Sequence, residues 1–404
     1  MTAGRPLEGL RVLDFAWIGA GALVTKALAE LGAEVVRIES RARPDNLRLS
    51  PPFRPGTSGL DASGYFASRN SGKHSVALDM KHPRARDIAL RFVEVSDVLT
   101  SNFRTGVLDR WGLGYDAVRA VNPRLVYLVM PMQGTDGPHR DHVGFGSTIA
   151  ALAGLVHPSG LPGRTPVGTG THYPDHVPNP GHALVALLAA IFHQRATGEG
   201  QLLELSQLES TINVLGPGVL NASIGGEDEA VGNRSPGGLP RNTYRCADDR
   251  WLAISCRTEG HWQALCEALD RKPLLVDPRF VTPFARAANL DALDVAVAER
   301  VAAHDRPALL DRLRAAGVPA APVNDARDML EDEDLRARGF WNDVDHAVIG
   351  SLPMFHLPFV FDGVERTDVP APPLLGEHTE EVVTRVLGLT DDEYRELVED
   401  GVFH

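Results

Sequence analysis

The spacing of hydrophobic and polar residues in the N-terminal half alternates between that of buried strands and that of helices. The apolar runs with the length and composition of strands are 10–16, 33–39, 75–78, 98–101 and 125–130. The segments with apolar residues at helical spacing lie between these runs, at 22–31, 83–94 and 115–120. Because strands that alternate with helices are typical of β-α-β units, the expected fold class is α/β. We expect a large Rossmann-like domain with an open, mostly parallel sheet.

The pattern changes near Gly225, where a polar stretch interrupts the alternation. The short strand patterns and then the helical patterns beyond it are 243–245, 251–255, 261–269 and 291–303. We therefore expect residues 1–225 to form the N-terminal part of the large domain and residues 226–330 to form a smaller α+β domain. From Phe340 the chain is rich in proline and is expected to be extended. It ends in helical patterns at 379–387 and 391–399.

Composition excludes several classes of protein. At 404 residues the chain is long enough for two domains, and its formal net charge of −13 argues against nucleic acid as a partner. The longest apolar run, 183–192, is shorter than a membrane span, and the first residues lack the apolar core of a signal peptide. A cytoplasmic location is therefore expected. Cys246, Cys256 and Cys266 are expected to be buried thiols rather than a disulfide or zinc set.

The first strand-to-helix turn contains Gly19 and Gly21, which raises the possibility of a dinucleotide site, and Glu39 ends the second strand. The dinucleotide fingerprint needs a third glycine so that the helix can pack close to the strand, and Val24 stands at that position. NAD is therefore not expected to bind.

Residues 171–182, T-H-Y-P-D-H-V-P-N-P-G-H, combine one carboxylate with three histidines and three prolines. His172, His176 and His182 suggest a metal site, but no second acidic ligand lies nearby, and the prolines disfavour regular structure between them. No metal is expected. His182 is expected to lie in the first turn of the following helix.

Asp175 has the side chain of a good helix N-cap, but the apolar helical run begins only after the prolines. A carboxylate on a rigid loop next to Pro174 needs little reorganisation before it reacts, which favours chemistry over capping. The residues alone still leave the role of Asp175 open among metal ligand, catalytic acid, nucleophile and cap.

The segment Y-P-D-H-V-P-N-P-G-H-A-L-V-A-L-L-A-A-I-F-H-Q-R-A-T-G-E-G-Q at 173–201 resembles the catalytic segment of the family III CoA transferases, the CaiB/BaiF-like group that includes formyl-CoA and carnitine CoA transferases. The resemblance covers nearly the whole chain. The other blocks that carry it are P-L-E-G-L-R-V-L-D-F (6–15), L-G-A-E-V-V-R-I-E (31–39), N-S-G-K-H-S-V-A-L-D-M-K (70–81), N-F-R-T-G-V-L-D-R-W-G-L-G-Y (102–115), G-N-R-S-P-G-G (232–238), A-G-V-P-A-A-P-V (316–323) and P-L-L-G-E-H-T (373–379).

The resemblance implies an acyl-CoA:carboxylate CoA transferase in which Asp175 is the nucleophile. In this family the aspartate attacks the thioester to give a mixed anhydride and then an aspartyl-CoA thioester, which is covalent catalysis by a carboxylate. The implied substrates are an acyl-CoA and a carboxylic acid. Succinyl-CoA is a common donor in the family. No prosthetic group is implied.

The resemblance also places the CoA contacts, on Ala20, Leu78, Lys81, Asn102, Phe103, Val107 and Arg110. Ser40 stands where some members have an arginine near the adenine, and Arg41 or Arg43 is expected to take that place. Each residue has an ordinary alternative: Leu78 could be part of the core, and Lys81 could be a solvated helix start.

The departures from the family pattern concern the acyl pocket. Gly19, Gly146 and Ala150 stand where members often carry polar side chains, which implies a larger pocket and an acyl group bulkier than formate or oxalate. Phe145 stands where the related racemases have their catalytic histidine. Gly237 and Gly238 match a glycine-rich lid of the family, or form a plain turn.

Architecture is implied by the resemblance alone. Members form interlocked dimers in which each chain is a ring, and residues 331–404 would form the extended return and the C-terminal helices that complete the large domain.

Two other functions stay open. One is an α-methylacyl-CoA racemase with His142 or His172 as partner of Asp175, and the other is a non-catalytic CoA-binding subunit of a heteromer. The implied partner is a second copy of the chain or a homologous subunit.

Overall fold

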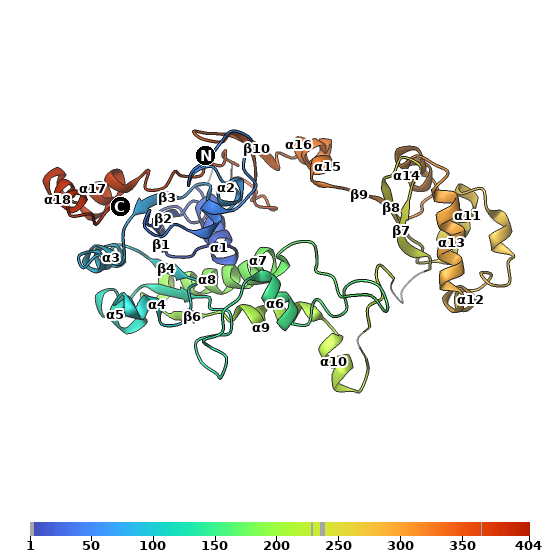
Figure 1. Ribbon diagram of the computed structural model, residues 1–404, viewed down its shortest axis with the longest axis horizontal. Coiled ribbons are helices and arrows are strands. Elements are labelled where there is room, and N and C mark those ends of the chain that lie inside the picture. Colours follow the sequence, from blue (N-terminus) through green and yellow to red (C-terminus); the bar gives the residue numbers. More distant parts are fainter. Residues whose placement is uncertain (1–3, 228, 235–238, 365) are drawn as a thin grey trace. The chain divides into compact units, whose positions relative to one another are not determined.

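The computed structural model describes residues 4–227, 229–234, 239–364 and 366–404. The chain divides into two compact units (Figure 1). Unit 1 comprises 1–157, 167–228 and 335–404, and unit 2 comprises 158–166 and 229–334. None of the helices among the described residues is both long and apolar enough to cross a membrane.

Unit 1 is built on a six-stranded sheet in the order β3-β2-β1-β4-β5-β6, and every pair in it is parallel. Its strands are β1 (Arg11–Asp14), β2 (Glu34–Glu39), β3 (His74–Ala77), β4 (Val98–Ser101), β5 (Val126–Val129) and β6 (Leu202–Glu204). The predicted α/β fold with a parallel sheet is confirmed. The strand β6 is not among the predicted ones, because its three residues are too few to show a pattern. The strand order reverses beside β1, and ligands of such sheets bind at that point.

The helices of unit 1 are α1 (Ala20–Glu30), η1 (Asn46–Leu49), α2 (Gly64–Asn70), α3 (Ala85–Glu94), α4 (Val107–Arg110), α5 (Tyr115–Val121), α6 (Gly146–Leu152), α7 (Tyr173–His176), α8 (Pro178–Thr197), α9 (Gln207–Ile212), η2 (Asn213–Leu215), α10 (Gly218–Ser223), α17 (Thr379–Leu387) and α18 (Asp391–Glu399). The helix α16 (Glu333–Ala337) spans the boundary with unit 2.

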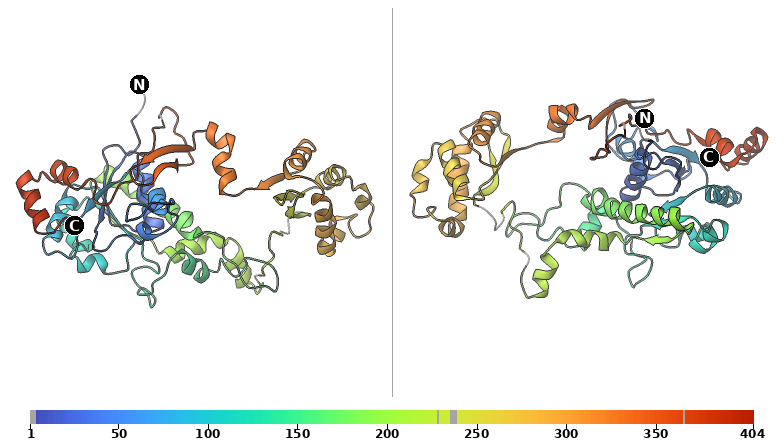
Figure 2. Two further views of the ribbon diagram at one scale, coloured as in Figure 1. Left: turned by 45° about the horizontal axis from the view of Figure 1, so that its top comes forward. Right: turned by 180° about the vertical axis from the view of Figure 1, so that it is seen from behind.

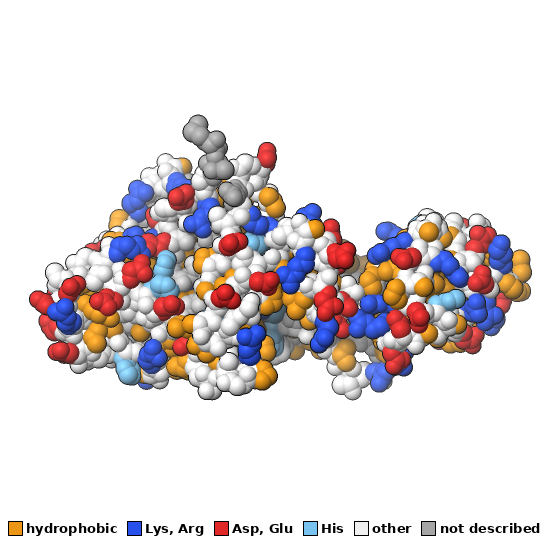
Figure 3. Space-filling model, turned by 90° about the horizontal axis from the view of Figure 1, so that it is seen from above, with side chains coloured by type: hydrophobic (Ala, Val, Ile, Leu, Met, Phe, Trp, Pro, Cys, Tyr) orange, Lys and Arg blue, Asp and Glu red, His pale blue; other side chains and the backbone are white. Residues whose placement is uncertain are grey.

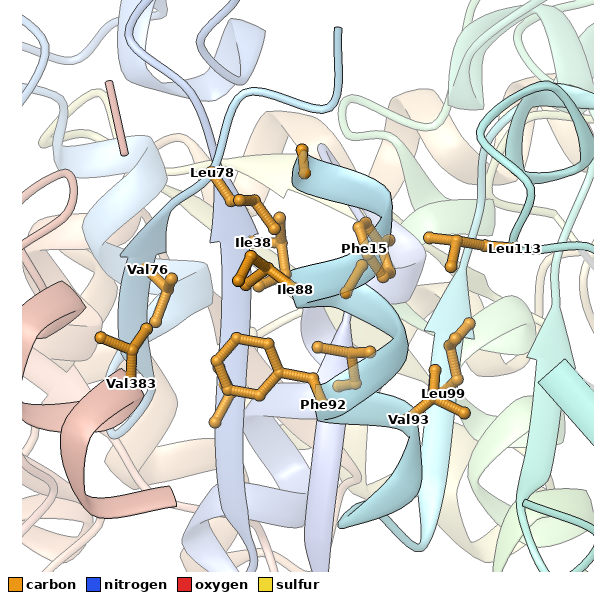
Figure 4. Close-up of a cluster of buried hydrophobic side chains, with 14 of the residues drawn as sticks. Phe15, Ile38, Val76, Leu78, Ile88, Phe92, Val93, Leu99, Leu113 and Val383 are labelled. Carbon is orange, nitrogen blue, oxygen red and sulfur yellow. The ribbon is translucent and has the colours of Figure 1, made fainter. Parts of the chain in front are cut away.

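The sheet of unit 1 is covered on both faces. On one face, Ile88 and Phe92 of α3 and Val383 of α17 pack over Ile38 and Leu99 of the sheet (Figure 4). On the other face, α1 and α8 pack on the sheet and on each other, and Figure 2 shows α8 from behind. A parallel sheet needs both covers because its central strands are apolar on both sides.

The segment around the aspartate differs from the prediction. Asp175 lies in the helical turn α7 rather than in a loop, and α8 begins at Pro178 rather than after the prolines. A proline is tolerated in the first turn of a helix because the N–H it lacks would have no intrahelical partner there. Gly198 ends α8 in the left-handed conformation, with φ of 82°.

Unit 2 contains an antiparallel sheet in the order β7-β8-β9 and a core of its own. Its elements are β7 (Arg241–Arg245), β8 (Trp251–Ser255), α11 (Glu259–Ala268), η3 (Lys272–Leu275), α12 (Pro283–Ala288), α13 (Leu290–Val301), α14 (Arg306–Ala315), β9 (Ala320–Val323) and α15 (Ala326–Glu331). Cys246, Cys256 and Cys266 are buried and free, as expected of thiols.

The C-terminal segment returns to unit 1. The segment predicted to be extended from Phe340 contains two strands, β10 (Trp341–His346) and β11 (Gly350–Phe355), which pair as an antiparallel hairpin. Proline is tolerated at such a two-stranded edge. The described residues of 356–378 lie in no helix or strand. The segment then reaches the free edge of β3, where His378 N donates to Ser75 O at 3.0 Å and Ala77 N donates to Thr379 Oγ1 at 3.0 Å.

Candidate active site

A cavity of about 540 Å³ lies in unit 1, beyond the carboxyl ends of four strands. The segments that follow β1, β2, β4 and β5 supply most of its wall. The residues that line it are Trp17, Ile18, Gly19, Ala20, Arg43, Pro44, Asn46, Asn102, Phe103, Arg104, Val107, Trp111, Pro131, Met132, Arg140, His142, Val143, Gly144, Phe145, Thr148, Asp175 and Gln207. This is the position at which open parallel sheets bind ligands.

Asp175 is buried at the wall of this cavity between two glycines. A Cβ atom on Gly19 would stand 2.7 Å from Asp175 Cγ, and one on Gly146 would stand 2.5 Å from Asp175 Oδ2. Real Cβ atoms do not approach carboxylates this closely, so both positions must be glycine if the carboxylate is to keep this place. Gly19 precedes α1 and Gly146 begins α6, so the carboxylate lies beside the N-termini of two helices.

The surroundings of Asp175 perturb its acidity. Burial raises its pKa above the ordinary value, while the charge of His172, a hydrogen bond from the Gly146 N–H and the charge of Arg69 oppose that change. A carboxylate with a raised pKa is a stronger base and a stronger nucleophile than one in water. The backbone N–H groups at the two helix N-termini can at the same time stabilise negative charge by donating hydrogen bonds to it.

The residue next to Asp175 is held by a buried arginine. Arg69 Nη2 lies 2.6 Å from His176 Nε2, and His176 Nδ1 lies 3.1 Å from Thr171 Oγ1. Because arginine can only donate, His176 Nε2 accepts and the ring is neutral. Burial and the charge of Arg69 lower the pKa of His176 to about 4.

The three histidines of this segment do not converge. His176 bonds Arg69, while His182 Nδ1 lies 2.7 Å from Ser210 Oγ, and His172 precedes α7. Among the residues that the structure describes, no group of three or more His, Cys, Asp and Glu side chains is arranged to hold a metal ion.

The structure brings seven of the predicted site residues to the cavity wall. They are Gly19, Ala20, Asn102, Phe103, Val107, Phe145 and Asp175. Gly146 contacts Asp175 without lining the cavity, and Ala150 is buried behind it in α6. The Asp175 carboxylate therefore occupies the room that side chains at 19 and 146 would need, and the enlarged acyl pocket expected from these glycines stays a prediction.

Four predicted CoA contacts lie outside the cavity wall. Leu78 belongs to the apolar core, and Lys81 and Arg110 are exposed. Arg41 Nη2 donates to Leu375 O at 3.0 Å, and of the two arginines considered beside Ser40, it is Arg43 that lines the cavity. Contact of these four residues with CoA stays a prediction. Gly237 and Gly238 lie outside the described residues.

The sequence analysis predicted Phe103 but missed the two tryptophans beside it, Trp17 and Trp111. Phe103 packs edge-on against Trp17, with ring centroids 5.1 Å apart, and against Trp111 at 5.6 Å. Asn102 supports this wall, since it accepts from Trp17 N at 2.8 Å and donates to Trp17 O at 2.6 Å. The rule that ligands lie past the carboxyl ends of parallel strands would have found these residues.

Cationic side chains at the cavity were also missed. Arg104 and Arg140 line it beside Arg43. Neither Arg43 nor Arg104 forms an ion pair with any described residue, so both are free to meet an anionic ligand. Elsewhere, on the face drawn in Figure 3, acidic and basic side chains are interspersed, so no broad basic surface for nucleic acid covers that face.

Comparison with known proteins gives one consistent result. The sequence model of the family described as CoA-transferase family III matches residues 7–379. The chain is 30% identical over 402 residues to the succinyl-CoA–L-malate CoA-transferase beta subunit of Chloroflexus aurantiacus, covering 98% of each chain. It is 32% identical over 408 residues to a probable CoA-transferase of Mycobacterium tuberculosis, covering 99% of this chain but only half the length of that relative.

A solved structure has the same fold. The crystal structure of a CaiB/BaiF family protein from Brucella suis matches with a TM-score of 0.87 and 30% sequence identity. The match covers 95% of this chain and 100% of that one.

Proposed function

The chain belongs to CoA-transferase family III, and we propose that it moves CoA from an acyl-CoA to a free carboxylic acid with Asp175 as the covalent nucleophile. The observation that carries the proposal is the place of Asp175. It is a buried carboxylate, with its pKa raised by burial, at the wall of a 540 Å³ cavity and beside the N-termini of α1 and α6.

The proposed reaction proceeds in four balanced steps. Asp175 attacks the thioester carbonyl, the C–S bond breaks, and a mixed anhydride and the CoA thiolate result. The thiolate then attacks the aspartyl carbonyl, which releases the donor acid as a carboxylate and leaves an aspartyl-CoA thioester. The acceptor carboxylate attacks this thioester to form a second anhydride and free the thiolate again. In the last step the thiolate attacks the acyl carbonyl, which gives the new acyl-CoA and regenerates Asp175.

The surroundings of Asp175 suit these steps. No proton moves in them, so no general base is needed, and a neutral His176 beside the carboxylate is compatible with the chemistry. Each attack puts negative charge on a carbonyl oxygen, which the backbone N–H groups at the start of α1 and α6 can stabilise. Burial keeps water from the anhydrides, which hydrolyse readily. The steps need neither a metal nor a prosthetic group, so activity should survive exhaustive treatment with a chelator.

The CoA moiety is proposed to lie along the segments after β1 and β4. The phosphates of CoA need local cations in a chain with a net charge of −13, and Arg43 and Arg104 at the cavity supply them. Arg41, Lys81 and Arg110 are proposed to meet the more distant phosphates. Further contacts are proposed with Ala20, Leu78, Asn102, Phe103 and Val107, of which Ala20, Phe103 and Val107 are apolar residues at the cavity wall.

The acyl group is proposed to be bulkier than formate or oxalate. Met132, Val143 and Phe145 give the cavity an apolar wall, against which a bulky acyl group can pack. Succinyl-CoA is the proposed donor, in line with the name of the Chloroflexus relative.

An interlocked dimer is proposed as the active form, with a second copy or a homologous subunit. Two apolar surfaces in unit 1 support it. Val185 and Phe192 of α8 are 70% and 78% exposed, and Leu220 and Ile224 at α10 are 65% and 78% exposed. Residues seven or four positions apart share one face of a helix, and an exposed apolar face is typical of a surface that packs against another chain. The lid proposed for Gly237 and Gly238 would come from the partner in such a dimer.

The test is a panel of acyl-CoA esters combined with a panel of carboxylic acids, read by mass spectrometry for exchanged CoA esters. We expect exchange with branched or aromatic acids and little with oxalate. Turnover with oxalate as fast as with any bulky acid would refute the proposed acyl class. A lack of exchange with every pair would refute CoA transfer itself.

A racemase is a second candidate, because His142 lines the same cavity as Asp175. It would exchange the α-hydrogen of a 2-methylacyl-CoA for deuterium in heavy water without an acceptor acid, whereas a transferase would not. A third candidate, a non-catalytic binding subunit, would bind acyl-CoA without forming any covalent adduct on Asp175.

A further inference from the structure

The loop between β1 and α1 brings Gly19 against Asp175, and side chains from other elements hold three consecutive residues of this loop. Arg37 Nη1 donates to Ala16 O at 2.6 Å. Asn102 binds both backbone groups of Trp17. Ile18 N donates to Asp45 Oδ2 at 3.0 Å. Backbone held at successive residues cannot drift while the neighbouring carboxylate reacts.

Ile18 has a backbone conformation that isoleucine rarely adopts. Its φ is 58°, in the left-handed region, where a β-branched side chain clashes with its own backbone. Such a residue keeps this conformation only where its surroundings hold it, and such residues cluster at functional sites. The contact that holds the Ile18 backbone is the hydrogen bond to Asp45.

Asp45 is fully buried and connects the loop to the sheet. Its Oδ2 also accepts from Arg37 Nη2 at 2.5 Å, and its Oδ1 accepts from Leu47 N at 2.9 Å at the start of η1. Arg37 is fully buried in β2, next to β1. The Arg37–Asp45 pair therefore ties the loop to β2 and η1, although Asp45 does not line the cavity.

We infer that Asp45 is a positioning residue for the reaction at Asp175: paired with Arg37, it fixes Ile18 in the left-handed conformation and so keeps Gly19 and the start of α1 against the nucleophile. The inference rests on the proposed function and deepens it. It assigns a role to a charge that touches neither CoA nor the acyl group. The geometry that carries it is the chain of contacts from Arg37 through Asp45 and Ile18 to Gly19. Gly19 packs so closely on the nucleophile that a Cβ atom on it would stand 2.7 Å from Asp175 Cγ.

The first variant is Asp45→Asn. An amide has one acceptor oxygen and one NH₂ donor, so it must face either Ile18 N or Leu47 N with its donor. If the loop is released, Gly19 moves away from Asp175. We expect kcat for transfer to fall about a hundredfold, the size of a displacement of about 1 Å at reacting atoms. The KM for acyl-CoA should change by less than about threefold, because the binding contacts remain.

The matched control is Glu39→Gln. Glu39 is buried in the same network and accepts from Arg48 and from Ser75 Oγ, but it forms no hydrogen bond with the loop. It should lower the melting temperature without the hundredfold loss in kcat. If Asp45→Asn loses kcat only in proportion to its loss of folded protein, as Glu39→Gln does, Asp45 has a structural role alone and the inference is wrong.

The second variant is Ile18→Gly, because glycine adopts a φ of 58° without strain. In this background Asp45→Asn should lower kcat by less than about tenfold, because a glycine at 18 has no strain that the hydrogen bond must offset. A loss as large as in the isoleucine background would overturn the inference.

Hydrogen exchange of the wild-type chain covers the case in which Asp45→Asn does not fold or no CoA transfer is found. The amide of Ile18 should exchange as slowly as those of β1. Fast exchange there overturns the inference whatever the activity. Slow exchange in a chain that transfers no CoA overturns the proposed function but leaves the loop contacts supported.

Discussion

The interiors of the two units differ in kind. In unit 1, charged side chains of β1 and β2 and of segments beside them are buried together; the group includes Asp14, Arg37, Glu39, Asp45 and Lys73. In unit 2, the core consists of apolar side chains such as Trp262, Leu265 and Phe280. Arg286 is the one charged side chain that the described part of unit 2 buries.

The apolar core of unit 2 stabilises a fold, whereas buried charges of unit 1 also position the loop beside Asp175. The buried side chains of unit 2 are mostly apolar, and replacing buried ion pairs by apolar residues often stabilises a protein. In unit 1, several of the buried charges bind the loop that approaches Asp175. Lys73 Nζ donates to Asp14 Oδ2 at 3.2 Å, and Asp14 Oδ1 accepts from Ala16 N at 2.8 Å at the start of the loop. The buried charges therefore lie where the fold must be accurate.

The largest effect is expected from Asp175→Ala, which removes the buried carboxylate at the cavity of unit 1. Transfer should fall on the order of 10⁴-fold or more, the usual result of removing a covalent nucleophile, while CoA binding persists. Initial rates and an isothermal titration with CoA measure this. Residual transfer within about tenfold of the wild type would move the nucleophile elsewhere.

Asp175→Asn tests how much stability the buried carboxylate costs. The folded-state pKa of Asp175 is raised by burial, so its stabilising contribution is fully present below its unfolded pKa and is lost as the pH rises through the folded value. At neutral pH the ionised carboxylate therefore costs stability. A neutral amide should raise the melting temperature at pH 7, with the gain disappearing in acid. A lower melting temperature at neutral pH would contradict the sign.

In unit 2, Leu265→Ala should act on stability alone. Leu265 is fully buried in the apolar core, so its truncation is expected to cost about 2–5 kcal/mol of unfolding free energy. Transfer per folded molecule should not change. Chemical denaturation and a rate corrected for folded fraction measure both, and a loss of kcat in the folded protein would give the core of unit 2 a part in catalysis.

Acid should weaken the charged interior of unit 1. Burial opposes ionisation of Glu39, but Arg37 and Arg48 outweigh it and lower its pKa to about 2. The stability that this carboxylate contributes is therefore present above its ordinary pKa and is lost as the pH falls toward 2. Denaturation curves from pH 6 downward should show this loss in the wild type, and Glu39→Gln should flatten it. An equally steep curve in that variant would assign the acid sensitivity to other groups.

The smallest effect is expected at exposed charges. Lys81→Ala or Arg110→Ala should raise the KM for acyl-CoA about twofold to fivefold without changing kcat, as fits a partly exposed contact worth about 0.5–1 kcal/mol. Added salt should reduce the difference. The matched control is Arg119→Ala, an exposed arginine of α5 that does not line the cavity and should leave KM unchanged. Equal effects from all three would mean that net charge, and not a CoA contact, sets the KM.

Local sequence determined most of the elements, and its motifs named seven of the residues at the cavity wall. The strands at 33–39 and 98–101 and the helices α17 and α18 follow from periodicity, because a run of residues with one buried face encodes that face by its own spacing. Asp175 was found through the motif around it. The prolines after Asp175 led to a wrong prediction of where α8 begins. The sequence alone does not distinguish a proline in the first turn of a helix from one that ends a helix.

The tertiary structure decided what no spacing encodes. Trp17, Trp111 and Asp175 are far apart in sequence and meet only because the ends of β1, β4 and β5 lie side by side in the sheet. The same holds for Asp45, which accepts hydrogen bonds from the N–H of Ile18 and from the buried Arg37. Sequence fixes which side chains prefer to be buried, but only the packed sheet brings their polar atoms within hydrogen-bonding distance, since those distances depend on strand order rather than on separation along the chain.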